Sequence, residues 1–238
     1  MISIIIPVYN HAKELGLCLD SVLRQDFIDL EVIIVDDGSQ DSLQKVLEEQ
    51  KEKFNKRDLR LKIIHQDNKG ANSARNRGFL ESSGNYIIFF DADIVMKPIM
   101  LKKMRNALKV NSEASYAYSS FKFGFKIFKL WEFDSKKLQQ MPYIHTSSLI
   151  RRSDFSNFDE SIKKLQDWDL WLTMLENGHK GVWIPEILFK VKPRKIGMSF
   201  WLPSFFYKIP WQKFGISFNK VRQYENAVKI IKEKHKIL

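Results

Sequence analysis

Short apolar runs rich in β-branched residues recur along the first ninety residues and alternate with stretches of helical periodicity. The apolar runs are residues 2–8, 31–35, 61–65 and 86–90. The helical stretches between and after them are residues 11–25, 42–54, 71–81 and 99–109. Strands that alternate with amphipathic helices at this spacing predict right-handed βαβ units and a largely parallel, Rossmann-like α/β sheet flanked by helices.

The second half of the chain is less regular. Its pattern predicts a strand or hairpin at 116–128, a short strand at 146–150, a helix at 167–176, and two strands, at 182–184 and 187–191, around Pro185. Pro, Trp, Phe and Lys dominate from Lys192 to about Phe218, and a basic helix at 219–236 follows. We therefore expect an α/β domain over residues 1–198 and a C-terminal basic-aromatic extension, partly helical, over residues 199–238.

The chain is basic and contains one cysteine. A formal net charge of +11 favours anionic partners, which include nucleic acid, anionic lipid and phosphorylated ligands, and selects none of them. Cys18 alone allows neither an internal disulfide nor a Cys-based metal site, so the composition is compatible with a reducing cytoplasm. Residues 1–8 lack the basic start of a signal peptide, and no run approaches ~18 uninterrupted apolar residues. We expect a cytoplasmic protein.

Polar side chains follow three of the apolar runs directly. Asn10 follows the first run, Asp36 and Asp37 end the second, and Asp91 and Asp93 follow the fourth. Ligands of open parallel sheets bind at the carboxyl ends of the strands. The sequence therefore predicts a ligand site at this edge of the sheet.

Asp91 and Asp93 are candidate metal ligands. Two carboxylates at positions i and i+2 after a buried strand can converge on a hard divalent cation, Mg²⁺ or Mn²⁺, which prefers oxygen ligands and leaves positions for substrate phosphates. Such a cation would neutralise the charge that grows on a departing diphosphate. The alternative for the same tripeptide is a solvated turn.

Two further segments can contact a nucleotide. Asp36 or Asp37 can accept hydrogen bonds from a base N–H or from ribose hydroxyls, although Ser39 or Asp41 can equally cap the next helix. Gly70, at the start of the third helix, would let the backbone approach a ligand beside a helix N-terminus that favours anions.

Two charged residues on predicted helices, Arg75 and Asp167, can each be interpreted in two ways. Arg75 can reach a base or phosphates, or it can belong to an exposed basic face, which is the stronger alternative for Arg77. Asp167 can cap its helix or act as a general base on an acceptor hydroxyl.

Other candidate residues are assigned mainly to structure. Trp168 and Trp171 fit either the core or the wall of a sugar pocket. The histidines lack metal-ligand spacing: we expect His65, His145 and His179 to be structural and His11 to lie in a solvated loop.

Together these segments resemble the family 2 glycosyltransferases, which have the GT-A fold and invert the configuration of the transferred sugar. The five matching segments are residues 3–10, residues 32–39, Gly70 with residues 74–76 and Gly78, residues 90–93, and residues 158–160 followed by 166–171. They occur in the family's order and span roughly residues 2–190. Each segment alone is a weak signal, but five matches in order are a strong one.

The resemblance implies roles for these residues. It implies that Pro7, Tyr9 and Asp36 or Asp37 line a nucleoside pocket with Gly70 and Arg75 nearby, that Asp91 and Asp93 hold the donor through Mn²⁺ or Mg²⁺, and that Asp167 is the catalytic base. The reaction would be a single in-line displacement at the anomeric carbon.

Three positions depart from the family pattern. Ile94 stands where an acidic residue is common, and Gln166 stands where a Glu often precedes the base. A basic residue that grips the diphosphate is not evident, and the candidates are Lys192, Arg194 and Lys195.

The implied activity is transfer of a sugar from a nucleotide-diphosphate sugar donor to a glycan or lipid-linked acceptor, in cell-surface polysaccharide or glycolipid synthesis. The alternatives are a nucleotidyltransferase on a similar fold and a non-catalytic sugar-nucleotide-binding scaffold. An oxidoreductase is disfavoured because no Gly-x-Gly-x-x-Gly follows the first strand, and no motif supports nucleic-acid binding.

Residues 199–214 are dense in Trp, Tyr and Phe and are followed by many lysines. Aromatic rings favour the headgroup interface, and basic groups favour an anionic leaflet. This segment predicts peripheral association with the inner face of the cell membrane. The alternatives are packing of these aromatics on the domain or a homodimer interface.

Overall fold

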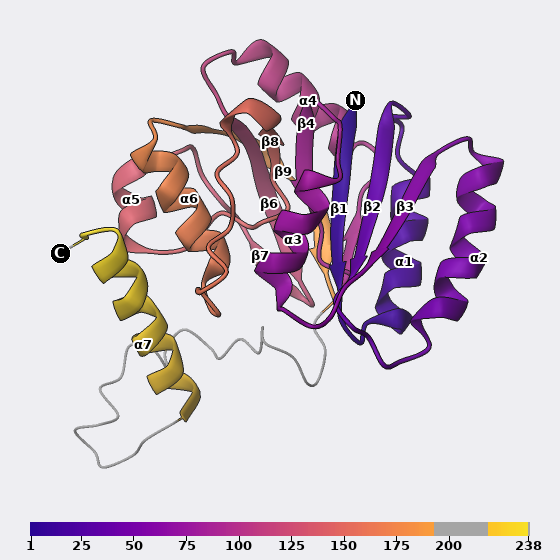
Figure 1. Ribbon diagram of the computed structural model, residues 1–238. Coiled ribbons are helices and arrows are strands. Elements are labelled where there is room, and N and C mark those ends of the chain that lie inside the picture. The colour runs from indigo at the N-terminus through magenta and orange to yellow at the C-terminus, as the bar shows by residue number, and fades with distance from the viewer. Residues whose placement is uncertain (193–218, 238) are drawn as a thin grey trace.

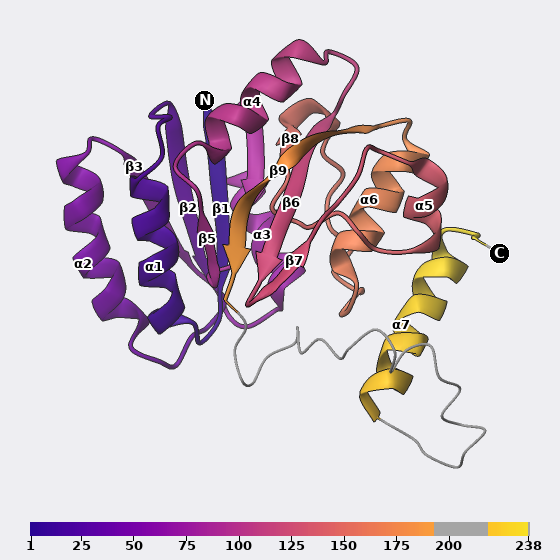
Figure 2. The same cartoon turned by 180° about the vertical axis from the view of Figure 1, so that it is seen from behind.

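The computed structural model describes residues 1–192 and 219–237, and over these residues the chain forms a nine-stranded sheet flanked by helices (Figures 1 and 2). The strands are β1 (Ile2–Val8), β2 (Leu30–Asp36), β3 (Arg60–His65), β4 (Tyr86–Phe89), β5 (Ile94–Met96), β6 (Tyr116–Phe123), β7 (Lys126–Phe128), β8 (Leu149–Arg151) and β9 (Gly181–Val191). The helices are α1 (Ala12–Leu23), α2 (Leu43–Lys56), α3 (Ala71–Leu80), α4 (Met100–Val110), α5 (Ser135–Gln140), α6 (Gln166–Glu176) and α7 (Asn219–Lys234), with a 3₁₀ turn at Arg152–Asp154.

The first half of the chain forms the parallel part of the sheet. The strand order is β3-β2-β1-β4-β8-β6-β9-β5, with β7 paired to β6, and the first four strands of this order run parallel. Helix α3 covers one face of these strands, and α1 lies on the other (Figures 1 and 2). Because both faces are covered, β1 and β2 are apolar almost throughout. The predicted βαβ units are confirmed.

Outside the four parallel strands, the structure differs from the sequence prediction in three places. Residues 181–191 form one strand, β9, so the prediction of two strands around Pro185 was wrong. Its pairing with β6 jumps from Ser119–Ile184 to Ser120–Ile187, which leaves Pro185 and Glu186 in a bulge where a missing N–H breaks no ladder hydrogen bond. The predicted hairpin at 116–128 is confirmed as β6 and β7, whereas the short elements β5 and α5 were not predicted.

The C-terminal end of α7 lies next to α6 (Figure 1). Its Ile231 side chain is fully buried, and ion pairs join its last turn to α6. The predicted helix at 219–236 is therefore confirmed to within two residues at its end, and it contacts the preceding domain. The predicted aromatic segment, residues 199–214, lies outside the described residues.

Close packing of α3 on the sheet depends on Gly78. A Cβ at this position would lie 2.4 Å from Ile5 Cγ2 and 3.2 Å from Val35 Cγ2. We expect Gly78→Ala to lower the free energy of unfolding by about 1–3 kcal/mol, because the methyl group overpacks the contact with β1 and β2. The denaturant midpoint measures this change.

A matched control lies in α1. A Cβ at Gly16 would meet no atom closer than 3.8 Å, so Gly16→Ala should stabilise the protein by about 0.5–1 kcal/mol through helix propensity. Equal midpoints for the Gly78 variant and the parent chain would contradict this account of α3 packing.

Candidate functional site

The candidate site lies at the carboxyl edge of the parallel strands. Val8 pairs with Asp36 at the ends of β1 and β2, and β4 ends beside β1 just before Asp91. The strand-end clusters therefore gather at one edge, as predicted. Pro7 lies within β1, and Tyr9, directly after it, keeps an exposed side chain.

Asp37 organises the loop that begins α3. Its Oδ1 accepts hydrogen bonds from Gln66 Nε2 and Lys69 N, and its Oδ2 accepts one from Gly70 N, each at 2.8 Å. Gly70 has φ 94°, a conformation that other residues rarely adopt, and precedes the first turn of α3. The structure thus places Asp37 as the anchor of the Gly70 backbone, and it is itself buried.

Asp36 joins the ends of β2 and β3. Its Oδ1 accepts from Ser39 N at 2.9 Å, and its Oδ2 lies 3.0 Å from His65 Nδ1. The alternative in which Ser39 or Asp41 caps the next helix was wrong, because α2 begins after Ser42 without a side-chain cap. Asp41 instead accepts a hydrogen bond from Ala12 N at the start of α1.

Arg75 connects three segments that are far apart in sequence. Its Nη2 donates to Asp91 Oδ1 at 2.8 Å, and its Nη1 donates to Gln166 Oε1 and Asn72 Oδ1 at 3.0 Å. Its guanidinium also lies 5.2 Å from the centre of the Phe158 ring. The side chain is only 6% exposed, so an exposed basic face was the wrong alternative for Arg75.

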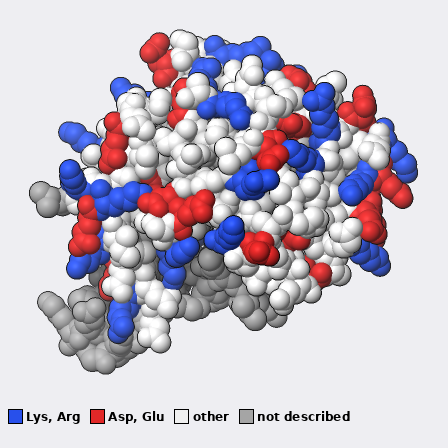
Figure 3. All heavy atoms as spheres, viewed as in Figure 1, with Lys and Arg blue, Asp and Glu red and all other residues white. Residues whose placement is uncertain are grey.

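Arg77, on the opposite side of the same helix, lies on an exposed basic face, as we predicted for this residue from the sequence. Its side chain is exposed and pairs with Glu81 one turn later. Over the face seen in Figure 3, lysine and arginine are interspersed with acidic residues among the described atoms.

Asp91 keeps a partly exposed carboxylate beside Arg75. Burial would raise the pKa of Asp91, but the charge of Arg75 and its hydrogen bond to this carboxylate hold the pKa below its usual range. Asp93 lies in a turn in which Ile94 N donates a hydrogen bond to the carbonyl oxygen of Asp91. The backbone carbonyl of Asp93 accepts a hydrogen bond from Lys192 N at 2.9 Å. Lys192 is therefore the one candidate diphosphate-gripping residue that the described residues include, and its backbone lies beside Asp93.

Asp167 lies in the first turn of α6, directly after Gln166. The helix begins after Leu165, whose φ of 56° is left-handed and costs about 1–2 kcal/mol for a residue other than glycine. The Asp167 carboxylate accepts a hydrogen bond from Trp168 N at 2.9 Å and does not occupy the N-cap position. Burial raises the pKa of Asp167, and nearby His145 and Arg75 only partly offset this effect.

His145 belongs to the candidate site, although from the sequence we expected it to have only a structural role. It lies close enough to Asp91 and Asp167 that a proton on its ring would lower the pKa of each carboxyl group. Its Nδ1 accepts from Ser147 N at 3.1 Å, and its ring packs 5.1 Å from the rings of Phe121 and Phe189. Burial lowers the pKa of His145, which favours a neutral ring with its proton on Nε2. No spacing in the sequence signals this position.

The two tryptophans of α6 are core residues. Trp168 and Trp171 are fully buried, and their indole N–H groups donate to the carbonyls of Leu138 and Ile144. A sugar-pocket wall was therefore the wrong alternative for both. Their burial fixes which face of α6 points inward and so leaves Asp167 toward the carboxyl edge of the sheet.

A parallel sheet of this order, extended by strands of mixed direction and with carboxylates at the strand ends, is the GT-A fold. S. aureus TarS, solved as residues 1–349 in complex with UDP-GlcNAc, superposes with a TM-score of 0.69 at 21% identity, over 87% of this chain and 63% of that one. A mannosyltransferase of Pyrobaculum calidifontis, solved with GDP-Man and Mn²⁺, superposes with a TM-score of 0.67 at 17% identity. The match covers 84% of this chain and 58% of that one.

Sequence comparison identifies the family. Residues 3–161 match the sequence model of glycosyl transferase family 2, and the chain belongs to this family. It is 38% identical over 111 residues to the uncharacterized glycosyltransferase EpsJ of Bacillus subtilis, a match that covers 47% of this chain and 31% of that protein. It is 35% identical over 105 residues to the glycosyltransferase GlyG of Streptococcus pneumoniae. This match covers 44% of this chain and 34% of that protein. The chain thus matches about a third of the length of these relatives.

Among the described residues, no helix is both long and apolar enough to cross a membrane.

Proposed function

We propose that this chain is an inverting glycosyltransferase that transfers a sugar from a nucleotide-diphosphate donor to an acceptor hydroxyl with the help of a divalent cation. The observation that carries the proposal is the Arg75 bridge. One guanidinium binds Asp91, on the donor side of the proposed reaction, and Gln166, directly before the proposed base. The bridge supports the proposal because it links Asp91 to the start of α6, where the proposed base lies.

The nucleoside end of the donor is assigned to the ends of β1 and β2. Tyr9 offers an exposed ring for contact with a base, and the Asp36 carboxylate lies at the end of the neighbouring strand. Asp37 and Gly70 form the supporting loop, and Pro7 lies near the end of β1, paired with Val35 of β2. TarS and the Pyrobaculum mannosyltransferase, solved with UDP-GlcNAc and with GDP-Man, support a nucleotide-sugar ligand of this general class.

Asp91 and Asp93 fit a hard cation that the donor helps to bind. The described residues contain no group of three or more His, Cys, Asp or Glu side chains arranged around a metal position. Mg²⁺ and Mn²⁺ bind well through one or two carboxylates when substrate phosphates supply the other oxygens. A bound cation would stabilise negative charge on the diphosphate leaving group. The Mn²⁺ in the Pyrobaculum complex supports this assignment.

Asp167 is the proposed general base. Its carboxylate would take the proton of the acceptor hydroxyl while that oxygen attacks the anomeric carbon and the nucleoside diphosphate leaves from the opposite face. Inversion of configuration follows from the single displacement. Its raised pKa makes Asp167 a stronger base than an ordinary carboxylate, and Gln166 beside it adds no second negative charge.

A donor-hydrolysis screen tests the proposal. Nucleotide sugars that differ in base and sugar are incubated with the protein, with and without Mn²⁺, and the products are separated. Release of a nucleoside diphosphate supports a glycosyltransferase. In a parallel incubation with a sugar phosphate and a nucleoside triphosphate, release of pyrophosphate would support the nucleotidyltransferase alternative. Binding of nucleotide sugars without turnover would support a scaffold.

The acceptor is proposed to be a glycan or a lipid-linked glycan at the inner face of the cell membrane. A relative of 31% identity over 111 residues is named as a cholesterol galactosyltransferase of Borreliella burgdorferi, which supports a lipid acceptor. The aromatic and basic residues of the 199–214 segment supply chemistry that suits a headgroup interface.

We expect the intact chain to float with phosphatidylglycerol vesicles and to stay behind with phosphatidylcholine vesicles, because each basic group near an anionic leaflet contributes about 1 kcal/mol. A variant with serine in place of Trp201, Phe205, Phe206 and Trp211 should float much less. If the parent chain fails to float with either vesicle, membrane docking is wrong.

A further inference from the structure

The C-terminal end of α7 and His235 after it are joined by ion pairs to α6 and to the loop before it. Lys234 Nζ lies 2.7 Å from Oδ1 of Asp169 and 2.7 Å from Oδ2 of Asp159. His235 Nε2 lies 2.9 Å from the same Asp169 oxygen, and its Nδ1 lies 2.8 Å from Glu176 Oε1. The side chains of His235 and Asp169 are 2% and 3% exposed, so water screens this contact little.

The contacts of His235 require a charged ring. Each ring nitrogen faces a carboxylate oxygen, and a neutral imidazole has only one N–H to donate. Both hydrogen bonds form together only when both nitrogens are protonated. Burial would lower the pKa of His235, but its hydrogen bonds to Asp169 and Glu176 outweigh burial and raise the pKa above its ordinary value.

Lys234 ties together two segments that flank the proposed base. Asp169 lies in the first turn of α6, two residues after Asp167. Asp159 belongs to the preceding loop, where its carbonyl accepts a 2.7 Å hydrogen bond from Asn72 of α3. The chain between these two contacts passes through the left-handed Leu165. A strained backbone conformation persists only where its surroundings hold it.

We propose that α7 is a clamp that positions the catalytic base: Lys234 and His235 hold the first turn of α6 through Asp169, and so keep Asp167 at the carboxyl edge of the sheet. The inference rests on the proposed role of Asp167. Lys234 and His235 are positioning residues, since their contacts reach Asp169 and not Asp167.

Lys234→Met tests the clamp. We expect kcat to fall by roughly 10-fold or more while the donor KM changes by less than about 2-fold, because misplacement of a catalytic group by about 1 Å can cost ~10²-fold in rate. Lys234→Arg should recover most of the rate, since a guanidinium can also donate to two carboxylates.

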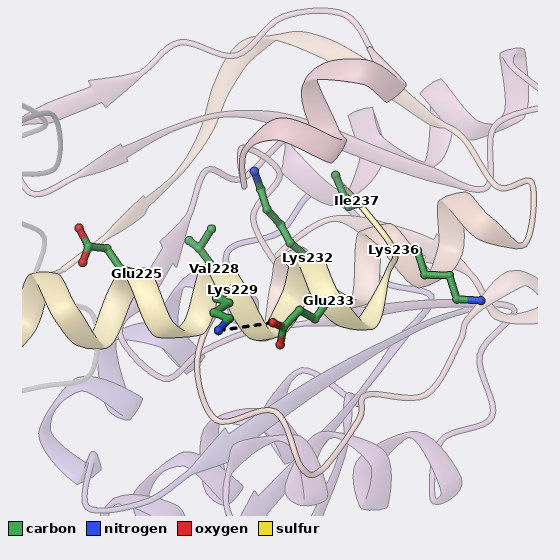
Figure 4. A pocket seen from close by; sticks show the side chains of 7 residues that line it. All are labelled: Glu225, Val228, Lys229, Lys232, Glu233, Lys236 and Ile237. Atoms are coloured by element: carbon green, nitrogen blue, oxygen red, sulfur yellow. Dashed lines mark ion pairs between the residues drawn. The ribbon is translucent and has the colours of Figure 1, made fainter.

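The matched control is Lys229→Met. Lys229 lies on the same helix and pairs with Glu233 along its outer surface (Figure 4), where its side chain is 74% exposed. This variant should keep the parent kcat. Thermal melting of each variant shows that the comparison is between folded proteins.

Amide hydrogen exchange of residues 166–170 tests the clamp without any substrate. Lys234→Met should accelerate exchange in this segment, and Lys229→Met should not. Unchanged exchange would overturn the clamp, and accelerated exchange with an unchanged kcat would overturn the positioning of the base. If the parent chain transfers no sugar, the proposed function fails, while the exchange result still decides whether α7 holds α6.

The charge on His235 gives the clamp a pH dependence. The groups that face this ring are Asp169 and Glu176 of α6, with Lys234 beside it and Asp159 beyond. A raised folded-state pKa contributes stability that is complete below about pH 6.5 and is lost as the pH rises through the folded-state value. The opening free energy of residues 166–170, corrected for intrinsic exchange, should therefore fall above about pH 6.5 in the parent chain. In His235→Gln it should stay constant over the same range, and equal profiles would contradict this role of His235.

Discussion

Asp167→Asn is expected to fold and bind the donor nucleotide as the parent chain does, and to transfer sugar ~10²–10⁴-fold more slowly. Asparagine keeps the shape of the side chain, and its amide oxygen can still accept the hydrogen bond from Trp168 N. It removes the basic lone pair, and general base catalysis is typically worth this factor. Initial rates of acceptor glycosylation and the affinity for the nucleoside diphosphate separate these two effects.

The matched control is Asp58→Asn, in a turn after α2. Asp58 has φ 51°, a left-handed conformation that asparagine adopts equally well, so this change should alter neither stability nor rate. In the parent chain the rate should fall as the pH drops through the raised pKa of Asp167, because only the carboxylate accepts a proton. Near-native transfer by Asp167→Asn would show that the base lies elsewhere and that Asp167 serves only α6.

Removal of the divalent cation is expected to abolish turnover, and Mn²⁺ or Mg²⁺ should restore it. The described part of the chain offers no cluster of three metal-binding side chains that could hold a cation without the donor. We therefore expect the cation to bind weakly to the free protein and more tightly in the presence of a nucleoside diphosphate. Asp93→Ala should lower the rate at least ~10²-fold, the low end of what loss of preorganised charge stabilisation costs.

Glu113→Ala is the control for the loss of one negative charge, because Glu113 lies exposed in the turn after α4. This variant should keep the parent rate and the parent dependence on Mn²⁺. Full turnover in excess chelator would eliminate the metal from the proposed mechanism. Titration of Mn²⁺ against the protein, with and without nucleoside diphosphate, measures the expected cooperation directly.

The parallel half of the fold follows from local patterns, and the second half does not. Hydrophobic periodicity and the carboxylates at strand ends are visible within a few consecutive residues of sequence. For this reason β1 to β4 and the position of Asp91 could be predicted. Strand β5 has three residues, too few to show a period, and β9 continues past Pro185 because a bulge in its pairing with distant β6 accommodates the ring. That bulge is a tertiary feature.

The site shows the same division. The chemistry of Asp91 and Asp167 could be inferred from residue type and place, but Arg75 contacts Gln166 across 91 positions of sequence. His145 became a candidate site residue only because folding brings it near both Asp91 and Asp167. Lys234 is one of many lysines near the C-terminus, and nothing in its local sequence distinguishes it from Lys229. Its partners, Asp159 and Asp169, are 75 and 65 residues away.

Cys18 has a practical consequence for labelling experiments. Its thiol is buried in α1, 3.9 Å from the carbonyl oxygen of Asp91, and burial together with the charges of Asp93 and Asp91 raises its pKa far above the usual range. A thiol held protonated and shielded from solvent reacts slowly with alkylating reagents. Because it is the chain's only cysteine, a cysteine introduced at an exposed position of α7 would be the sole reactive thiol of the folded protein. A fluorophore attached there would report the environment of that helix without a background signal from the native thiol.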